Sequence, residues 1–152
     1  MIALIQRVLE SSVTIDSQLV DKIDGGLLVL LGVREDDNDN DAKYLAAKTV
    51  NFRIFQDSND KMNLSLLDTG GEILIVSQFT LHADTRHGNR PSFTDAAEPE
   101  TAESLYESYI NECKSLLSPD RVRMGRFGAM MKVKLTNDGP VTIILRSKND
   151  YQ

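Results

Sequence analysis

The feature of the sequence that most constrains the fold is an uninterrupted apolar run, Gly26-Leu27-Leu28-Val29-Leu30-Leu31-Gly32-Val33. An apolar run of about four to eight residues without alternation is typical of a strand that is buried on both faces. Its longest stretch of large apolar side chains, Leu27–Leu31, is far too short to span a bilayer. We therefore expect a sheet built around residues 26–33.

Alternating and β-branched segments predict the other strands of this sheet. Ile2–Val8 alternates, and the segments Val13–Ile15 and Leu19–Ile23 flank Asp16-Ser17-Gln18, which is typical of a hairpin. We expect a turn at Thr136–Pro140 between the last two strands. The remaining predicted strands are Arg53–Phe55, Glu72–Phe79, Arg121–Met124, Met131–Leu135 and Val141–Arg146.

Two segments predict helices. Acidic residues over Asp36–Asp41 suit a helix N-terminus, and the helical spacing continues to Phe52. Pro99 is placed as in the first turn of a helix that ends before Ser118-Pro119. Its apolar residues recur at steps of three and four: Ala102, Leu105, Tyr106, Tyr109, Ile110, Cys113, Leu116 and Leu117. Between the strands and this helix, residues 82–93 form a loop whose length suggests a function.

The order of these elements predicts the fold class. Many strands, two main helices and no repeated β-α-β rhythm indicate an α+β fold with curled, mostly antiparallel sheets. At 152 residues, with 41% hydrophobic and 26% charged residues, the chain fits a single globular domain over residues 1–152. The first residues lack a basic stretch followed by a long apolar one, so we expect a cytoplasmic protein without a membrane segment.

The charge of the chain limits how it can contact nucleic acid. A net charge of -6 disfavours a protein that binds by neutralising many phosphates. Any contact with RNA must be local, and the candidate cations are Arg86 with Arg90 in one loop and Lys132 with Lys134 on one face of a strand. Each pair can also be read as part of an ordinary solvated surface.

Several chemistries are disfavoured because their motifs are missing from the sequence. The sequence contains no dinucleotide-binding, P-loop, zinc-protease or α/β-hydrolase signature. The single cysteine, Cys113, cannot form an internal disulfide. His82, Asp84 and His87 form the one cluster of metal-like side chains, which we attribute to the composition of a polar loop. We expect neither a metal nor a cofactor.

Two short segments combine polar groups with a strand that is otherwise apolar. They are Ser77-Gln78-Phe79-Thr80-Leu81 and Asn137-Asp138-Gly139-Pro140-Val141-Thr142. Such groups can form the floor of a binding pocket. The alternative is local: hydroxyls at the end of a strand satisfy backbone groups, and Asn-Asp-Gly-Pro makes a tight turn.

These segments also carry a resemblance. Over its whole length the sequence resembles the D-aminoacyl-tRNA deacylase (D-tyrosyl-tRNA deacylase) family. The resemblance rests on two separated motifs with matching spacing, supported by other segments along the chain. The matching segments are Met1–Val8, Gly26–Val33, Arg53–Phe55, Lys61–Asn63, Ser77–Leu81, Arg90–Phe93 and Asn137–Thr142.

The resemblance implies a barrel-like core with the deacylase fold, and a homodimer whose two pockets lie at the subunit interface. It implies that Ser77, Gln78, Phe79 and Thr80 line the catalytic pocket. The Gly139–Pro140 peptide would be cis and would enter the partner's pocket, braced by Arg7. Phe127 and Met131 would lie near the terminal adenosine of the substrate, which is the aminoacylated 3' end of a tRNA.

The chemistry of an aminoacyl ester fits such a site. The ester is already activated, so hydrolysis needs a placed water and a stabilised oxyanion. No Asp, Glu, His or Lys lies within Ser77–Leu81, so we expect catalysis assisted by the RNA. The N–H groups around Phe79 and Thr80 would hold the oxyanion, and the 2'-hydroxyl of the terminal ribose would direct the water. The alternative is a nucleophilic Thr80 Oγ, for which the sequence offers no adjacent base.

Selectivity follows from a wall of main-chain atoms at Gly139 and Pro140. Such a wall excludes an L side chain by collision but admits hydrogen, so D-aminoacyl esters and glycyl esters, including glycine mischarged on tRNA(Ala), should be hydrolysed. A deacylase devoted to glycine is the nearest alternative. A non-catalytic β-domain that binds nucleic acid is another, which the acidic balance disfavours.

Overall fold

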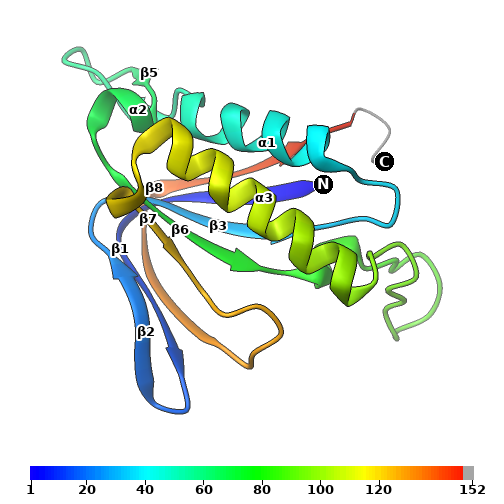
Figure 1. Ribbon diagram of the computed structural model, residues 1–152. Coiled ribbons are helices and arrows are strands. Elements are labelled where there is room, and N and C mark those ends of the chain that lie inside the picture. The colour runs from blue at the N-terminus through cyan, green and yellow to red at the C-terminus, as the bar shows by residue number, and fades with distance from the viewer. Residues whose placement is uncertain (149–152) are drawn as a thin grey trace.

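A six-stranded mixed sheet forms the centre of the protein (Figure 1). The computed structural model describes residues 1–148. Strand β1 (Ile2–Ile15) has fourteen residues and pairs antiparallel with three other strands. The other strands are β2 (Gln18–Ile23), β3 (Gly26–Gly32), β6 (Glu72–Ser77), β7 (Val122–Met124) and β8 (Lys132–Arg146), in the order β2-β1-β3-β6-β7 with β8 on β1. β3 pairs with the first half of β1 and β2 with its second half, while β8 follows its length, and the sheet is nearly closed into a barrel.

The apolar run forms β3, as predicted, and is buried on both faces. Leu27 and Val29 have no exposed surface and belong to the main core beneath the helices. Leu28, at 1% exposure, faces the opposite way, into a smaller core that is enclosed by the curled half of the sheet. Alternate side chains of one strand thus join two separate cores, which is why polar residues are missing from the run.

Both predicted helices are present and lie side by side on one face of the sheet (Figure 1). Helix α1 (Asp39–Asn51) begins at a capping box formed by Asn38 and Asp41, so its acidic start caps the helix as expected. Helix α3 (Pro99–Leu117) has Pro in its first turn and buries the predicted apolar stripe except for Leu116, which is half-buried. None of the helices within residues 1–148 is long and apolar enough to cross a membrane.

The sequence patterns did not predict several short elements between α1 and β6. A two-stranded hairpin pairs β4 (Phe55–Gln56) with β5 (Met62–Leu64), so only the last residue of the strand predicted at Arg53–Phe55 is in a strand. Helix α2 (Leu66–Thr69) follows, capped by Ser65 and ended by Gly70 in the left-handed conformation. A helix of one turn leaves too little periodicity to be recognised in a sequence.

The sheet is mostly antiparallel, as predicted, but it contains two parallel pairs. β3 pairs parallel with β6, and β6 pairs parallel with β7. Among residues 1–148, four of the six strand pairs are antiparallel. The two crossovers carry α1 and α3 over the same face. The expectation of no β-α-β rhythm was therefore incomplete, because the short elements and the long loop disguise the crossovers.

Two predicted boundaries are wrong at the places where the motifs lie. Residues 136–140 are not a turn between two strands, because β8 runs through them without a break. The register of β8 against β1 shifts on both sides of Val8, so the segment is an irregularity inside a long strand. Strand β6 ends at Ser77, and Phe79–His82 forms the short 3-10 helix η1 instead of continuing the strand to Phe79.

Candidate active site

The segment Ser77–Thr80 lies where β6 ends and the chain turns. Ser77 is the last residue paired with β3, opposite Leu31. The Gln78 backbone N–H donates to the Leu31 carbonyl at 2.7 Å, and η1 then turns the chain out of the sheet. Phe79 and Thr80 are consequently exposed. Their N–H groups are the first of the helical turn, and such groups have no acceptor inside the helix.

Two contacts hold the side chains of this segment. The Gln78 amide donates a hydrogen bond of 2.5 Å to the Thr80 hydroxyl. The ring of Phe79 meets the ring of Phe93 edge-on, with 5.1 Å between their centroids. Phe93 belongs to the long loop, which is itself pinned by backbone pairing of Asp84 with Ser92. The loop therefore packs against the predicted catalytic segment.

The ionisable side chains that follow the segment have other partners. His82 is buried at 7% exposure and forms a hydrogen bond to the backbone of Gly32. Burial lowers the pKa of His82 and so favours its neutral form. Asp84 accepts two hydrogen bonds from the Arg86 guanidinium, at 2.9 and 2.7 Å, and these hold the pKa of its carboxyl well below the usual range. Among residues 1–148, no cluster of His, Cys, Asp or Glu is arranged to hold a metal.

The second motif projects from β8 and is anchored by Arg7. Gly139 and Pro140 are exposed, and the peptide bond between them is cis. The buried Arg7 guanidinium lies 2.9 Å from the Asp138 carboxylate and donates to the Ile54 carbonyl at 2.6 Å. The Asn137 amide donates to the carbonyls of Arg7 and Val141, each at 2.9 Å. Arg7 thus contacts this segment through its ion pair with Asp138.

The two motifs are far apart within one chain. Gly139 and Pro140 lie opposite Arg7 of β1, and Arg7 is level with Leu27 of β3 and Ile73 of β6. Gly139 and Pro140 are therefore three strand spacings from β6, and along the strand direction they are level with Ile73, four residues before Ser77. With about 4.8 Å between strands and about 3.3 Å per residue, the separation measured along the sheet is about 20 Å. One chain alone does not bring the two motifs together.

Phe127 and Met131 lie on the connection between β7 and β8. Phe127 packs against the ring of Tyr106, with 5.8 Å between centroids, and joins the main core. Met131 packs against the smaller core, next to Val76. The connection runs beside the end of β6, because the Gly125 N–H donates to the Ile75 carbonyl at 2.9 Å. Both residues are therefore close to the predicted catalytic segment.

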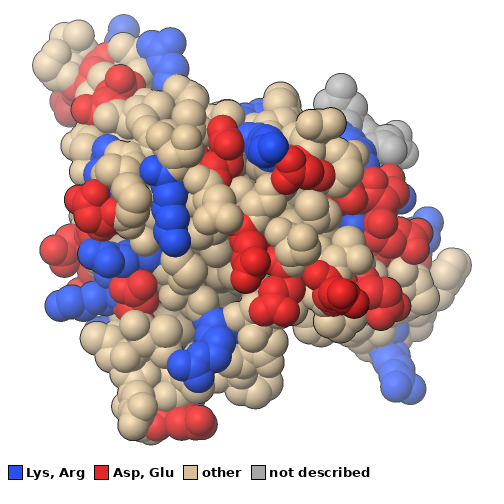
Figure 2. Space-filling model, in the orientation of Figure 1, with Lys and Arg blue, Asp and Glu red and all other residues tan. Residues whose placement is uncertain are grey.

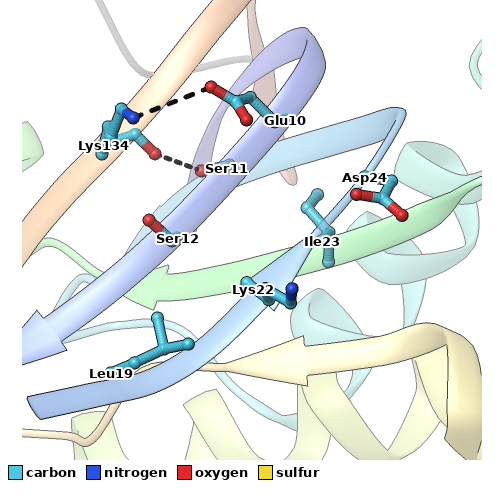
Figure 3. A pocket seen from close by; sticks show the side chains of 8 residues that line it. All are labelled: Glu10, Ser11, Ser12, Leu19, Lys22, Ile23, Asp24 and Lys134. Atoms are coloured by element: carbon cyan, nitrogen blue, oxygen red, sulfur yellow. Dashed lines mark hydrogen bonds and ion pairs between the residues drawn. The ribbon is translucent and has the colours of Figure 1, made fainter.

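A separate hollow of about 190 Å³ lies among β1, β2 and β8 (Figure 3). Lys134, one of the cations considered for RNA, lies 3.9 Å from Glu10 there, and its carbonyl accepts from Ser11 at 3.0 Å. None of the residues predicted for the active site lines this hollow. It is lined by Glu10, Ser11, Ser12, Leu19, Lys22, Ile23, Asp24 and Lys134. Basic and acidic side chains are also interspersed on the face shown in Figure 2.

Three residues that the sequence analysis did not single out support the candidate site. Asp138 holds Arg7, Phe93 holds Phe79, and Tyr106 supports Phe127 while its hydroxyl donates to the Ile75 carbonyl at 2.9 Å. Asp138 and Phe93 lie inside segments that match the deacylase family, and this could have pointed to a role in the site. Tyr106 gave none beyond the apolar stripe of its helix.

Comparison with known proteins decides the family. The family model described as D-Tyr-tRNA(Tyr) deacylase matches residues 4–146, which include both motifs. The chain belongs to this family. A D-aminoacyl-tRNA deacylase of Thermosipho africanus is 56% identical, covering 98% of this chain and 99% of the relative. Another, of Roseiflexus castenholzii, is 57% identical over 95% of this chain and 91% of the relative. The resemblance that the sequence motifs suggested is confirmed.

Two solved structures have the same fold as this chain. A structure titled c-Myc DNA Unwinding Element Binding Protein is 39% identical and superimposes with a TM-score of 0.93. The match covers 97% of this chain and 99% of that one. A structure titled as a probable eukaryotic D-amino acid tRNA deacylase is 17% identical with a TM-score of 0.84, over 95% of this chain and 97% of that one. The second likeness concerns the fold alone. The predicted deacylase fold is confirmed, and family membership makes the chain one of a family of hydrolases.

Proposed function

We propose that the protein hydrolyses the ester bond between a D-amino acid and the 3' end of a tRNA, and that it works as a homodimer in the cytoplasm. The observation that carries the proposal is the family match over residues 4–146, which spans Ser77–Thr80 and Gly139–Pro140 together. The exposure of both motifs and their separation within one chain support a pocket shared by two copies. In each pocket, Ser77–Thr80 of one subunit would face Gly139 and Pro140 of the other.

Main-chain donors and the substrate itself carry the reaction in this proposal. The exposed start of η1 supports it, because the N–H groups of Phe79 and Thr80 have no acceptor within that helical turn. They are suited to an oxyanion that develops when water attacks the ester carbonyl. The 2'-hydroxyl of the terminal ribose orients that water, or relays its proton by accepting it while its own proton passes to the departing 3'-oxygen. His82 is not the base, because its buried imidazole is bonded to the backbone of Gly32.

Rejection of L-amino acids depends on main-chain atoms of Gly139 and Pro140 in the partner's pocket. The anchoring of this segment by Arg7 and Asn137 supports such a role, since a wall that discriminates by collision must be rigid. Hydrogen at the α-carbon passes the wall, so glycyl esters, including those on tRNA(Ala), are also substrates. The D side chain points away from the wall, so its identity has little influence on the rate.

The test is a deacylation assay with D-tyrosyl-tRNA, L-tyrosyl-tRNA and glycyl-tRNA(Ala) on the purified protein. We expect the D-tyrosyl and glycyl esters to be hydrolysed and the L-tyrosyl ester to be spared. Equal rates for the D and L esters would refute the proposed selectivity. Hydrolysis of the glycyl ester alone would establish a glycine-clearing enzyme. Tight tRNA binding without turnover of any ester would establish a binding module instead.

A further inference from the structure

A groove with unpaired charges lies between α3 and the connection that follows β7. It has a volume of about 420 Å³, within the range of about 300 to 1,000 Å³ typical of ligand sites. Tyr106 and Phe127 form its aromatic part, and Glu107, Lys114 and Arg126 are among the charged residues that line it. Within residues 1–148, none of these three charged groups forms an ion pair.

The charges of the groove are segregated along α3. Glu103, Glu107 and Lys114 all line it from the same face of the helix, with the acids toward the N-terminus and the lysine in the last turn. At a rise of 1.5 Å per residue, Glu107 and Lys114 are about 10 Å apart along the axis. The groove therefore has an acidic end and a basic end, separated by roughly the length of one nucleotide.

The acidic end is the one nearer the candidate active site. The Tyr106 hydroxyl donates to the Ile75 carbonyl, and Gly125 bonds to the same carbonyl, so both walls of the groove meet β6 two residues before Ser77. Lys114 lies eight residues beyond Tyr106, in the direction away from Ser77, since α3 returns antiparallel to β6. An RNA strand that leaves the active site along the groove therefore meets the aromatic rings and acids first and Lys114 afterwards.

We propose that this groove binds the cytidine that precedes the terminal adenosine of the tRNA, an inference that rests on the proposed function. Glu107 accepts a hydrogen bond from the exocyclic amine of cytosine, the pairing by which carboxylates recognise that base. In this proposal Phe127 lies between the terminal adenine, near which the resemblance places it, and the cytosine, which stacks on its ring as bases stack on aromatic side chains in single-stranded RNA ends. Lys114, at the far end of the groove, contacts the phosphate on the 5' side of this nucleotide.

The chemistry of the base makes this assignment specific. Uracil presents a carbonyl where cytosine presents the amine, so it would place an acceptor against the carboxylate of Glu107. The groove should therefore favour cytosine over uracil. Because every tRNA ends in the single strand C-C-A, such a subsite recognises all tRNAs alike. It also gives an acidic protein a local way to bind RNA, with a few cations in place of a basic surface.

The test compares the D-tyrosyl ester of adenosine with the D-tyrosyl esters of the dinucleotides CpA and UpA, each carrying a 5'-phosphate so that the phosphate on the 5' side of the cytidine or uridine is present. We expect the wild-type protein to hydrolyse the CpA ester with a kcat/KM about 5- to 10-fold above that of the UpA ester, mainly through KM. In Glu107→Gln this preference should disappear or reverse, because glutamine can donate to the uracil carbonyl. Lys114→Ala should weaken both dinucleotide esters about threefold and reduce their salt dependence.

Matched controls lie outside the groove, one on α3 and one on α1. Glu112→Gln changes a carboxylate of α3 that interacts with Lys43 of α1, and Lys48→Ala removes a cation of α1 that rests on Tyr44. Both should leave the preference for cytosine unchanged. Hydrolysis of the plain adenosine ester should be the same in Glu107→Gln, Lys114→Ala and the wild type. An equal loss on all three esters would assign the groove to the terminal adenosine and overturn the proposal.

Binding of the uncharged trinucleotides CpCpA and UpUpA, measured by calorimetry, gives a readout that does not need turnover. If the wild type hydrolyses no ester but binds CpCpA more tightly than UpUpA, and Glu107→Gln removes that difference, the subsite stands and the proposed function fails. If D-tyrosyl-tRNA is hydrolysed but cytosine and uracil are treated alike in both assays, the subsite fails and the proposed function stands.

Discussion

Among individual residues, Thr80 separates the two possible mechanisms. Its hydroxyl accepts a hydrogen bond from the Gln78 amide, which orients the oxygen but cannot remove its proton. A hydroxyl nucleophile needs an adjacent base, and the nearest imidazole, His82, is buried against Gly32. These contacts fit the proposed mechanism, in which the Thr80 side chain has a positioning role and main-chain N–H groups donate to the oxyanion.

Replacing Thr80 with alanine should slow the reaction without abolishing it. Loss of one oxyanion donor costs about 100- to 1,000-fold in rate, and the main-chain donors survive this substitution, so we expect a loss of less than about 100-fold. Single-turnover hydrolysis of D-tyrosyl-tRNA measures the effect, with Ser77→Ala as a parallel variant. Complete loss in a folded Thr80→Ala protein, with an acyl-enzyme detected by mass spectrometry in the wild type, would establish a covalent mechanism.

Among the elements, η1 depends on His82 at its end. The imidazole is buried and bonded to Gly32, which ties η1 to the end of β3. Because burial lowers the pKa of His82, the unfolded chain binds a proton more readily than the folded protein does. The stability that neutral His82 contributes is therefore present above the ordinary pKa of about 6.5 and is lost as the pH falls through that value toward the folded pKa.

The unfolding free energy of the wild type should accordingly decrease as the pH falls below about 6.5. The variant His82→Gln keeps a donor for the backbone but has no proton to gain, so its profile should be flatter in this range. Urea denaturation at a series of pH values measures both proteins. The Met1 ammonium also has a pKa lowered by burial, but it is unchanged in the variant, so the difference between the profiles isolates His82. Identical slopes would contradict this account.

Sequence patterns predicted the regular elements well and the irregular ones poorly. The run at Leu27–Leu31 and the stripe of α3 repeat a simple period over many residues, so β3 and α3 were found. The two motifs sit where a period breaks: β6 turns into η1 after Ser77, and β8 carries an irregularity at Gly139 without ending. Contacts such as Arg7 with Asp138 join positions far apart in the chain, and no local pattern encodes them.

For the whole molecule, the separation of about 20 Å between the motifs is the main constraint. It leaves two possibilities: a shared pocket between two copies, or two unrelated sites in one chain. Gly139 offers a way to disturb one motif alone. Its φ of +117° disfavours a side chain, and a Cβ there would lie 2.9 Å from Val141 Cγ2 and 3.1 Å from Arg7 Nη2. Gly70→Ala is the matched control, because Gly70 also has a positive φ but an added Cβ meets nothing within 4 Å.

Mixing two inactive variants tests the shared pocket directly. Thr80→Trp fills the pocket from the exposed end of β6, and Gly139→Ala disturbs the segment that enters the pocket from the partner. If two variant homodimers are unfolded and refolded together in equal amounts, about half of the dimers are mixed, and each mixed dimer has one pocket with both lesions and one with neither. About a quarter of all pockets are then intact, so we expect about a quarter of the wild-type rate on D-tyrosyl-tRNA.

Sedimentation checks that the refolded proteins are dimers. A mixture of Thr80→Trp with the control Gly70→Ala shows the rate when only the Ser77–Thr80 motif is perturbed. A mixture of the two inactive variants that stays at the sum of their residual rates would mean that each pocket is built from a single chain.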